Sequence, residues 1–271
     1  MKLRCGRFSF SLDRPLVMGV VNVTPDSFSD GGQFFDKHAA LAHAATLINH
    51  GADILDVGGE SSRPGATPIA EEEELRRVLP LVETYRDFPV SVDTRRPAVM
   101  RAVLEVGASM INDIEALSAP GALAAVAKSD CAVCLMHKKG EPATMQRDPH
   151  YDDVVAEVKS YLDERVKAAK DAGIGAERIV VDPGFGFGKT VAHNLTLLKH
   201  LHALSGLPVL AGLSRKSSLQ KITGRPVGDR LAGSLAMALL ALLGGARILR
   251  VHDVKETRDV IAVWEAFKNE S

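Results

Sequence analysis

The sequence predicts an α/β protein in which parallel strands alternate with helices. A short apolar or β-branched run recurs eight times, each time followed by a loop and by a helix-period stretch rich in Ala and Leu. Eight such units make a closed TIM barrel, and barrels of about 250 residues are routinely one domain. We therefore expect a single barrel domain over residues 1–271. An open doubly wound sheet, which would bind its ligand at a strand-order switch, is the alternative.

The predicted elements follow one another along the whole chain. The strands are expected at 16–23, 53–59, 90–94, 109–114, 131–137, 178–184, 208–214 and 246–254. The acidic run 71–74 favours the start of a helix, because carboxylates suit the positive end of the helix dipole. A long helix is expected over 152–173, where Gly173 is a typical C-cap, and a last helix over 255–269.

Each predicted strand stays apolar until its C-terminal end and then turns polar. The polar residues at these ends are Asn22, Asp56, Asp93, Asn112, His137, Asp182, Ser214 and His252. In a TIM barrel these ends converge on one face, which carries the active site. A single polar strand end is commonly a loop hydrogen-bonder, but eight at the same structural position indicate one site.

The glycine-rich segment 182–190, "DPGFGFGKT", ends like a phosphate-binding loop of nucleotide enzymes. Such a loop needs four residues between its first glycine and Gly-Lys, and only three separate Gly184 from Gly188. We expect instead that the glycines let the backbone approach a flat ligand, while the Asp182 carboxylate accepts paired N–H donors. Lys189 either anchors the loop or is solvated, and the sequence does not choose between these roles.

Composition excludes several classes of partner. Net charge is −1 and aromatic residues are only 5%, so neither a nucleic-acid surface nor a base-stacking platform is expected. The N-terminal segment lacks the apolar core of a signal peptide, and no span of 18 apolar residues occurs, which predicts a cytoplasmic protein without membrane contact. Cys5, Cys131 and Cys134 do not form a disulfide or zinc framework and are expected in the core.

The loops after the first two and the last two predicted strands suit a large anion. Segments 22–32 and 58–66 are polar loops of the kind that can grip an anion and exclude water. Loops after strands seven and eight are the usual phosphate site of a TIM barrel. Three basic residues at these strand ends, Arg63, Arg250 and His252, could therefore surround a diphosphate, with Lys216 close by.

Eight blocks, in order and with matching spacing, resemble the dihydropteroate synthases of folate biosynthesis over residues 16 to 265 or so. They read "MGVVNVTPDSFSDGG", "DVGGESSRPGA", "SVDT", "INDI", "LMHKKGEPATMQ", "DPGFGFGK", "LSRKS" and "RVHDVKE". The resemblance implies a TIM barrel. It also implies a reaction that joins 6-hydroxymethyl-7,8-dihydropterin diphosphate to p-aminobenzoate and releases diphosphate, with Mg²⁺ as cofactor.

The resemblance also implies roles for individual residues. The pterin-binding positions correspond here to Asp93, Asn112, Met136, Asp182, Phe187, Gly212 and Lys216. The diphosphate-binding positions correspond to Ser62, Arg63, Arg250 and His252, and the p-aminobenzoate pocket to Phe28, Pro64, Phe187, Lys216 and Ser217. Asn22 corresponds to the magnesium ligand. The residues expected to act in catalysis are Asp93, Asp182, Lys216 and Arg63.

Two departures from the family pattern stand out. The second loop usually reads Ser-Thr-Arg-Pro, whereas Ser62 here keeps the hydroxyl without the methyl group that restricts its rotamers. Lys138 and Lys139 stand where less basic residues are expected. We expect neither change to abolish activity.

The expected chemistry needs no enzyme nucleophile, and no Gly-x-Ser-x-Gly elbow occurs. If C–O cleavage runs ahead of attack, positive charge spreads into the pterin while negative charge grows on the diphosphate. Asp93 and Asp182 would then face the cation, and Arg63, Arg250 and His252 the anion, which is preorganised electrostatic stabilisation. The weak nucleophilicity of an arylamine favours this hypothesis over direct displacement.

Three other functions compete with the synthase. Corrinoid methyltransferases that use methyltetrahydrofolate share the pterin-edge residues but have no need of the complete loops 22–32 and 58–66. An inactive pterin-binding paralogue would have lost some of Asn22, Arg63, Arg250 and His252, and a metal hydrolase would carry His-x-His after strand one. The partners expected are small-molecule substrates and, as the resemblance implies, a second copy in a homodimer. The apolar segment 231–246 fits that interface and burial against the barrel equally well.

Overall fold

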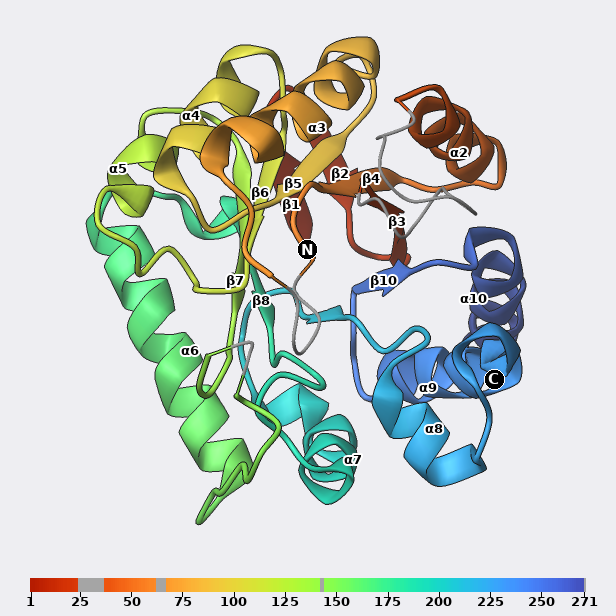
Figure 1. The fold of residues 1–271 in the computed structure, drawn as a ribbon. Helices are drawn as coiled ribbons and strands as arrows, with labels where there is room; N and C mark the ends of the chain where they lie inside the picture. Colours follow the sequence, from red (N-terminus) through yellow and green to blue (C-terminus); the bar gives the residue numbers. More distant parts are fainter. Residues whose placement is uncertain (24–36, 62–66, 142–143, 271) are drawn as a thin grey trace.

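A computed structural model of the protein describes residues 1–23, 37–61, 67–141 and 144–270. Its central feature is an eight-stranded parallel sheet in the order β8-β7-β6-β5-β4-β3-β10-β9. A parallel bridge between Val181 and Val209 joins the two outer strands. The sheet therefore closes on itself, and the helices surround it as an outer ring (Figure 1). The TIM barrel is confirmed, and the open doubly wound sheet is excluded.

All eight predicted strands are present, each shorter than its apolar run, and most of all the seventh, which keeps two of its seven predicted residues. They are β3 (Leu16–Asn22), β4 (Ile54–Gly58), β5 (Val90–Asp93), β6 (Met110–Asp113), β7 (Ala132–Met136), β8 (Ile179–Asp182), β9 (Leu210–Ala211) and β10 (Ile248–Val251). Six of them are buried at nearly every position, because the barrel interior covers one face and the helices cover the other.

The helices follow the strands as the sequence predicts. They are α2 (Lys37–Asn49), α3 (Glu71–Thr84), α4 (Pro97–Glu105), α5 (Ala122–Ala127), α6 (Val154–Asp171), α7 (Val191–Lys199), α8 (Ser217–Thr223), α9 (Leu231–Leu243) and α10 (Val254–Asn269). The acidic run does open α3, and α6 begins where the Asp153 side chain accepts hydrogen bonds from the N–H groups of Val155 and Ala156. α7 begins with a capping box between Thr190 and His193.

The apolar core has two parts, because side chains alternate between the two faces of every strand. The larger part lies between the sheet and the helices. The smaller part fills the barrel interior near the N-terminal ends of the strands, and its strand members are Leu16, Met18, Ile54, Met110, Ala132, Cys134, Val180, Leu210 and Ile248. The barrel is therefore filled at this end, and any ligand must enter at the other.

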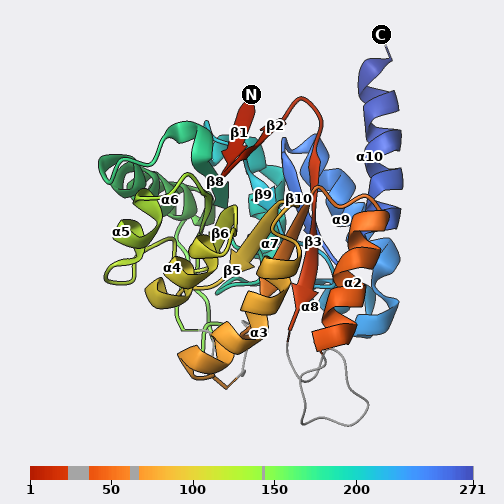
Figure 2. The same ribbon diagram turned by 90° about the horizontal axis from the view of Figure 1, so that it is seen from above.

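An N-terminal hairpin, not predicted from the sequence, covers that filled end. Strands β1 (Lys2–Cys5) and β2 (Phe8–Ser11) pair antiparallel. Leu3 and Cys5 point into the interior cluster, and the Gly6 N–H donates to the Asp130 carbonyl just before β7, at 3.0 Å. Figure 2 shows the hairpin at one end of the barrel and the β3 arrow pointing to the other. The hairpin therefore acts as a plug.

The cysteines and the helices agree with the compositional predictions. Cys5, Cys131 and Cys134 are all buried free thiols, as expected for core residues, and burial raises the pKa of each. Among the described helices, none combines the length and apolar composition that a bilayer crossing demands.

Candidate active site

A buried cluster of charges fills the barrel interior at the C-terminal ends of the strands. The Arg250 guanidinium, on β10, donates from Nε to Asp56 at 2.6 Å and from Nη2 to Asp93 at 2.9 Å. Asn112, on β6, donates its amide N–H to the Asp56 carboxylate at 3.3 Å. Because Asp56 is 0% exposed, its charge depends on these donors. Four strands thus contribute to one polar layer.

Burial makes the carboxylates of this layer easy to protonate. Desolvation raises the pKa of Asp93 to about 7, although the Arg250 cation opposes the shift. Desolvation also raises the pKa of Asp182, opposed mainly by the hydrogen bond from the Gly184 N–H. Arg250 lies between carboxylates that raise its pKa, so it stays charged. The layer thus holds a permanent cation beside Asp93, whose pKa is raised to about 7.

Asp182 and Gly212 form the neighbouring wall. Asp182 ends β8, and its Oδ1 accepts the Gly184 N–H at 2.7 Å. A Cβ built on Gly212 would lie 4.0 Å from Asp182 Oδ2 and 3.9 Å from Arg250 Cδ, so a larger side chain there would occupy space beside both groups. Asp182 and Arg250 are therefore parts of the same interior face, as the sequence predicts for strand ends.

Apolar side chains and a second cation lie next to Asp182, because Met136 on β7 is its register partner across the sheet. Met136, at the end of β7, and Phe187 pack in a small buried cluster with Ile114 and Met145. The Lys216 ammonium lies 4.5 Å from the centre of the Phe187 ring, a cation–π contact. A flat ring bounded by Met136 and Phe187 on one side and by carboxylates at its edge would suit this pocket.

Asn22, the residue expected to bind magnesium, lies beside Asp93. A Cβ built on Gly58 would lie 3.8 Å from Asn22 Oδ1 and 3.9 Å from Asp93 Oδ2. The two oxygens thus flank one glycine at the barrel mouth. Within the described residues no group of three or more His, Cys, Asp or Glu side chains gathers to hold a metal ion.

His252 and Ser214 pair with each other at the ends of β10 and β9. The Ser214 hydroxyl lies 3.0 Å from His252 Nδ1 and accepts the His252 backbone N–H at 3.2 Å. Burial, together with the nearby Arg250 and Arg215 cations, lowers the pKa of His252 to about 3. The imidazole is therefore neutral at ordinary pH and offers a neutral N–H donor, not a cation.

One of the eight polar strand ends does not join the site. The ring of His137 is buried against Tyr151 and Tyr161, and its Nδ1 contacts Lys189 behind the glycine-rich loop. The expectation that all eight strand ends share one site was therefore wrong for His137. Conversely, Asp56 was noticed only as a polar strand end, and sequence alone gave no sign that it would bind Arg250.

The glycine-rich loop needs its glycines for packing against the loop after β7. Gly184, Gly186 and Gly188 all have positive φ, at 69°, 80° and 64°. A Cβ on Gly184 would lie 1.9 Å from the His137 carbonyl oxygen, and one on Gly188 would lie 2.1 Å from that of Lys139. Close approach of backbone to backbone, as opposed to backbone to ligand, thus explains these two positions.

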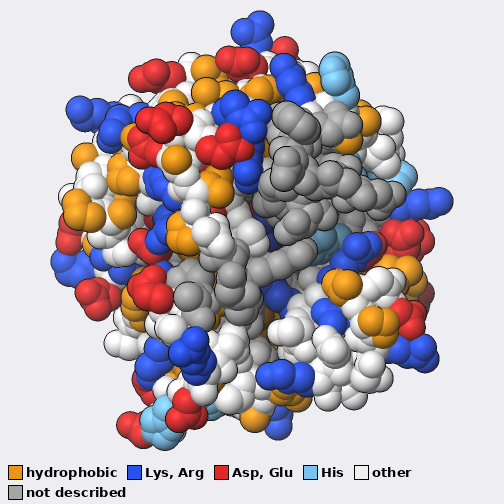
Figure 3. Space-filling model, in the orientation of Figure 1, with side chains coloured by type: hydrophobic (Ala, Val, Ile, Leu, Met, Phe, Trp, Pro, Cys, Tyr) orange, Lys and Arg blue, Asp and Glu red, His pale blue; other side chains and the backbone are white. Residues whose placement is uncertain are grey.

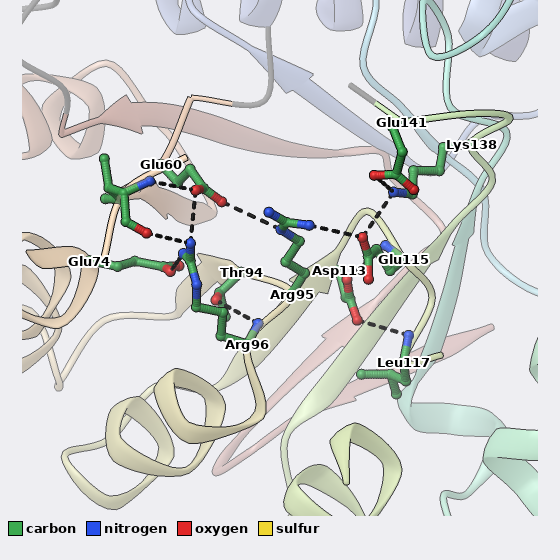
Figure 4. A network of polar contacts seen from close by, with 11 residues as sticks. Glu60, Glu74, Thr94, Arg95, Arg96, Asp113, Glu115, Leu117, Lys138 and Glu141 are labelled. Atoms are coloured by element: carbon green, nitrogen blue, oxygen red, sulfur yellow. Dashed lines mark hydrogen bonds and ion pairs between the residues drawn. The ribbon is translucent and has the colours of Figure 1, made fainter. Parts of the chain in front are cut away.

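A network of ion pairs crosses the rim from the loop after β4 to the loop after β7 (Figure 4). Arg95 bridges Glu60 and Glu115, at 3.5 and 3.3 Å, and Arg96 binds Glu60 and the buried Glu74. Lys138 continues the network, 2.9 Å from Glu115.

The unexpected lysines of the loop after β7 both have partners. Lys138 lies between Glu115 and, at 3.7 Å, Glu141. Lys139 pairs with Glu157 at 2.9 Å. Their positive charges are thus balanced locally.

In the space-filling view, Lys and Arg side chains gather around the middle of the face that carries the strand ends (Figure 3).

The remaining predicted site residues divide into two groups. Ser217 is exposed and begins α8, directly after Lys216. Phe28, Ser62, Arg63 and Pro64 lie outside the described residues. The structure thus brings together Asp93, Asn112, Met136, Asp182, Phe187, Gly212, Lys216 and Arg250, and their roles toward substrates stay a prediction.

Comparison with known proteins identifies relatives along the full chain. Residues 18–252 match the family described as pterin binding enzyme. The dihydropteroate synthase of Escherichia coli K12 is 50% identical, over 98% of this chain and 96% of that protein. A Yersinia pestis dihydropteroate synthase, solved with a sulfonamide drug complex, matches with a TM-score of 0.95 at 45% identity, covering 100% of both chains.

A third relative is similar to the same extent. The Xanthomonas albilineans dihydropteroate synthase, solved with 4-aminobenzoic acid, matches with a TM-score of 0.94 at 54% identity, covering 100% of this chain and 99% of that one. The chain belongs to the dihydropteroate synthases, transferases within the pterin-binding enzyme family.

Proposed function

We propose that the protein joins 6-hydroxymethyl-7,8-dihydropterin diphosphate to p-aminobenzoate, forming 7,8-dihydropteroate and diphosphate. The observation that carries this proposal is the convergence of Asp93, Asn112 and Asp182 inside a pocket walled by Met136 and Phe187. A pterin presents N–H donors beside acceptors along its pyrimidinone edge. Two carboxylates and an amide are the groups that can pair with such an edge.

We propose that the same carboxylates stabilise positive charge as the C–O bond breaks ahead of attack. Asp93 and Asp182 are buried, so their charges act on the pterin with little screening by water. The weak arylamine nucleophile then meets an already electron-poor methylene carbon. A secondary isotope effect near unity at that carbon would contradict this order of events.

The diphosphate is proposed to lie at the mouth, toward Ser62, Arg63, Arg250 and His252. Arg250 donates to two carboxylates from Nε and Nη2, and among the described residues no acceptor binds its Nη1, which could therefore donate to a phosphate oxygen. His252 is neutral in the ligand-free protein and would donate an N–H.

Mg²⁺ fits the oxygen donors at the mouth. The Asn22 amide oxygen and the Asp93 carboxylate flank Gly58, and this cation prefers such oxygen ligands together with substrate phosphates and water. When bound, the ion would neutralise charge that develops on the leaving diphosphate. The side chain of Asn22 would hold it, and no complete cage of protein ligands is required.

The decisive experiment measures diphosphate release with and without p-aminobenzoate. The synthase releases diphosphate from the pterin substrate only when the arylamine is present, whereas a hydrolase releases it in both cases. An inactive pterin-binding paralogue releases none. Chelation of Mg²⁺ is expected to stop release while pterin binding, measured by calorimetry, persists.

We also propose a homodimer formed through the outer helices α7, α8 and α9. Large apolar side chains are exposed there: Leu195, Ile222, Leu231, Leu240 and Leu243. Exposed apolar groups on neighbouring helices favour a protein interface. Sedimentation of the wild type against Leu240→Glu tests this, with the exposed Val263→Glu of α10 as matched control.

Free buried cysteines support a reducing compartment, and we propose the cytoplasm.

A further inference from the structure

Lys189 is a buried cation that the proposed reaction does not yet use. It directly follows the glycine-rich loop and is 2% exposed. Its ammonium lies 2.9 Å from His137 Nδ1, 3.0 Å from the Gly184 carbonyl and 3.0 Å from the Phe187 carbonyl. The His137 carbonyl lies farther away, at 3.4 Å. An ammonium has three N–H donors and no acceptor, so its charged form can bond three of these four acceptors at once.

These contacts tie the glycine-rich loop to the end of β7. The loop has few side chains of its own to pack, because three of its five residues between 184 and 188 are glycines. Its other polar groups are bound from outside: Gly186 N–H donates to Asn194 at 2.8 Å, and the Gly188 carbonyl accepts from Tyr151 at 2.9 Å. Lys189 is the described group that holds the carbonyl of Phe187.

Phe187 in turn supports the pocket. Its ring packs with Met136, Met145 and Ile114, and the Lys216 ammonium lies 4.5 Å above it. A shift of the Phe187 backbone would therefore move both the aromatic wall and the contact with Lys216. We propose that Lys189, as an ammonium, is a positioning residue that holds Phe187 and through it Lys216 in place for p-aminobenzoate.

The charge of Lys189 is sensitive to its surroundings. Burial lowers its pKa to about 7, with Asp182 opposing this shift and Lys216 and Lys139 adding to it. The titratable groups around it are His137 and Lys139 after β7, Asp182 on β8, Lys216 after β9, Tyr151 and Tyr161 beside His137, and His193 on α7. His137 has its pKa lowered to about 3 by burial and stays a neutral acceptor.

Loss of the Lys189 proton should weaken the contacts that hold the glycine-rich loop. Because the folded pKa of Lys189 lies below its unfolded value, rising pH removes the proton from the folded protein near neutrality. A neutral amine has only two N–H donors for the four acceptors around Lys189. The hold on Phe187 should therefore weaken as pH rises through 7, and the Michaelis constant for p-aminobenzoate should increase.

The inference rests on the proposed function, so the experiment first establishes arylamine-dependent diphosphate release by the wild type. Lys189→Met keeps the length of the side chain and removes all three donors. We expect the KM for p-aminobenzoate to rise at least tenfold, while pterin diphosphate affinity changes less than threefold, because Asp93 and Asn112 remain. Lys199→Met, on the exposed end of α7, is the matched control and should behave as wild type.

Substitution of the acceptor side gives a second, milder test. His137→Asn keeps an acceptor near the position of Nδ1 and should leave the KM near the wild-type value. His137→Leu removes that acceptor but leaves the three backbone carbonyls, and we expect a rise of about threefold. A folded Lys189→Met with an unchanged KM for p-aminobenzoate, or a His137→Asn variant as impaired as His137→Leu, would overturn the proposal.

The pH profile of the wild type tests the charged form without any variant. The KM for p-aminobenzoate should rise about threefold between pH 6.5 and 8.5, and a flat profile contradicts a role for the ammonium. This measurement remains decisive if Lys189→Met does not fold. In a folded Lys189→Met, the KM should be high and independent of pH over the same range.

Discussion

The two ends of the barrel use the same strands for opposite purposes. Toward the N-terminal ends, Ile54 and Ile248 lie in the apolar interior that the hairpin β1–β2 covers. Two residues further along the same strands, Asp56 and Arg250 form a buried ion pair at 2.6 Å. Each step of two residues advances a strand by about 6.6 Å on the same face. A residue that packs in the core and a residue of the charged layer are therefore only two positions apart on the same strand.

This difference predicts distinct consequences of substitution. At the plugged end the interior side chains form an apolar cluster, so a loss of packing there should lower stability and leave substrate affinity intact. At the open end, the carboxylates depend on Arg250 and on donors from the ligand. Substitutions there should affect ligand binding, and they should affect stability only where they leave a buried charge without its partner.

The largest effect is expected for Arg250→Met, which leaves the Asp56 and Asp93 carboxylates buried without their cation. Breaking a buried pair by removing one partner costs about 3–5 kcal/mol of folding free energy. Urea unfolding at pH 8 should show this loss, together with loss of activity. Protonation relieves unpaired carboxylates, so the loss should shrink at lower pH.

An exposed arginine provides the control. Arg4 pairs with Asp130 at 2.7 Å, but half of its side chain is exposed. Arg4→Met should therefore cost less than about 1 kcal/mol. If both arginine variants lose the same small amount of stability, the buried cluster is not the linked unit that its contacts imply.

Asp182→Asn should separate binding from folding at the open end. The amide oxygen can still accept the Gly184 N–H, but the other position now presents an N–H where the pterin also has donors. A buried polar group left unsatisfied costs about 1–3 kcal/mol, so pterin affinity should fall by as much as about a hundredfold. Calorimetry with pterin diphosphate measures this, and unfolding should be nearly unchanged. Near-normal affinity would remove Asp182 from the pterin site.

Leu3→Ala tests the plugged end. Leu3 is fully buried in the interior cluster, and Leu→Ala changes in cores cost about 2–5 kcal/mol. We expect about 2 kcal/mol, because a terminal hairpin can relax into part of the cavity. The KM values for both substrates should stay at wild-type levels. A change in KM without a change in stability would show that the two ends are coupled.

The sequence predicted the open end better than the plugged end, for a physical reason. Charged residues at strand ends such as Asp93 and Asp182 interrupt apolar runs, and this contrast is visible in one dimension. The hairpin strands have only four residues each, and their alternating pattern around Gly6 is a weak signal. Burial of Leu3 depends on a contact with strands far along the chain.

Pairings inside the site were likewise not predictable. Arg250 and Asp56 are 194 positions apart, and sequence shows two strand ends but not which groups bond. The role of Lys189 stayed open because a lysine after a turn is ordinarily exposed, and its acceptors come together only when the loop folds against His137 at the end of β7. Residue types therefore predicted which face of the barrel carries the site, whereas the hydrogen-bond partners within it could be identified only from the fold.

The smallest predicted effect concerns protons at the open end. The folded pKa of His252 is about 3, below the value of about 6.5 in an unfolded chain. Its neutral form therefore contributes stability that is complete above pH 6.5 and is lost as pH falls toward 3, by up to about 1.4 kcal/mol per pH unit. His252→Asn removes this dependence and keeps a polar group near Ser214.

The stability of His252→Asn relative to wild type should therefore rise by about 1 kcal/mol on going from pH 7 to 5.5. Asp93 and Asp113, with pKa values raised to about 7 and about 6, act in the opposite direction but are common to both proteins. Their contributions cancel in the difference. Exposed His50→Asn should give no such difference. If the stabilities of the two histidine variants, relative to wild type, depend on pH to the same extent, the surroundings of His252 do not hold it neutral. The open end would then accommodate a protonated His252 beside Arg250.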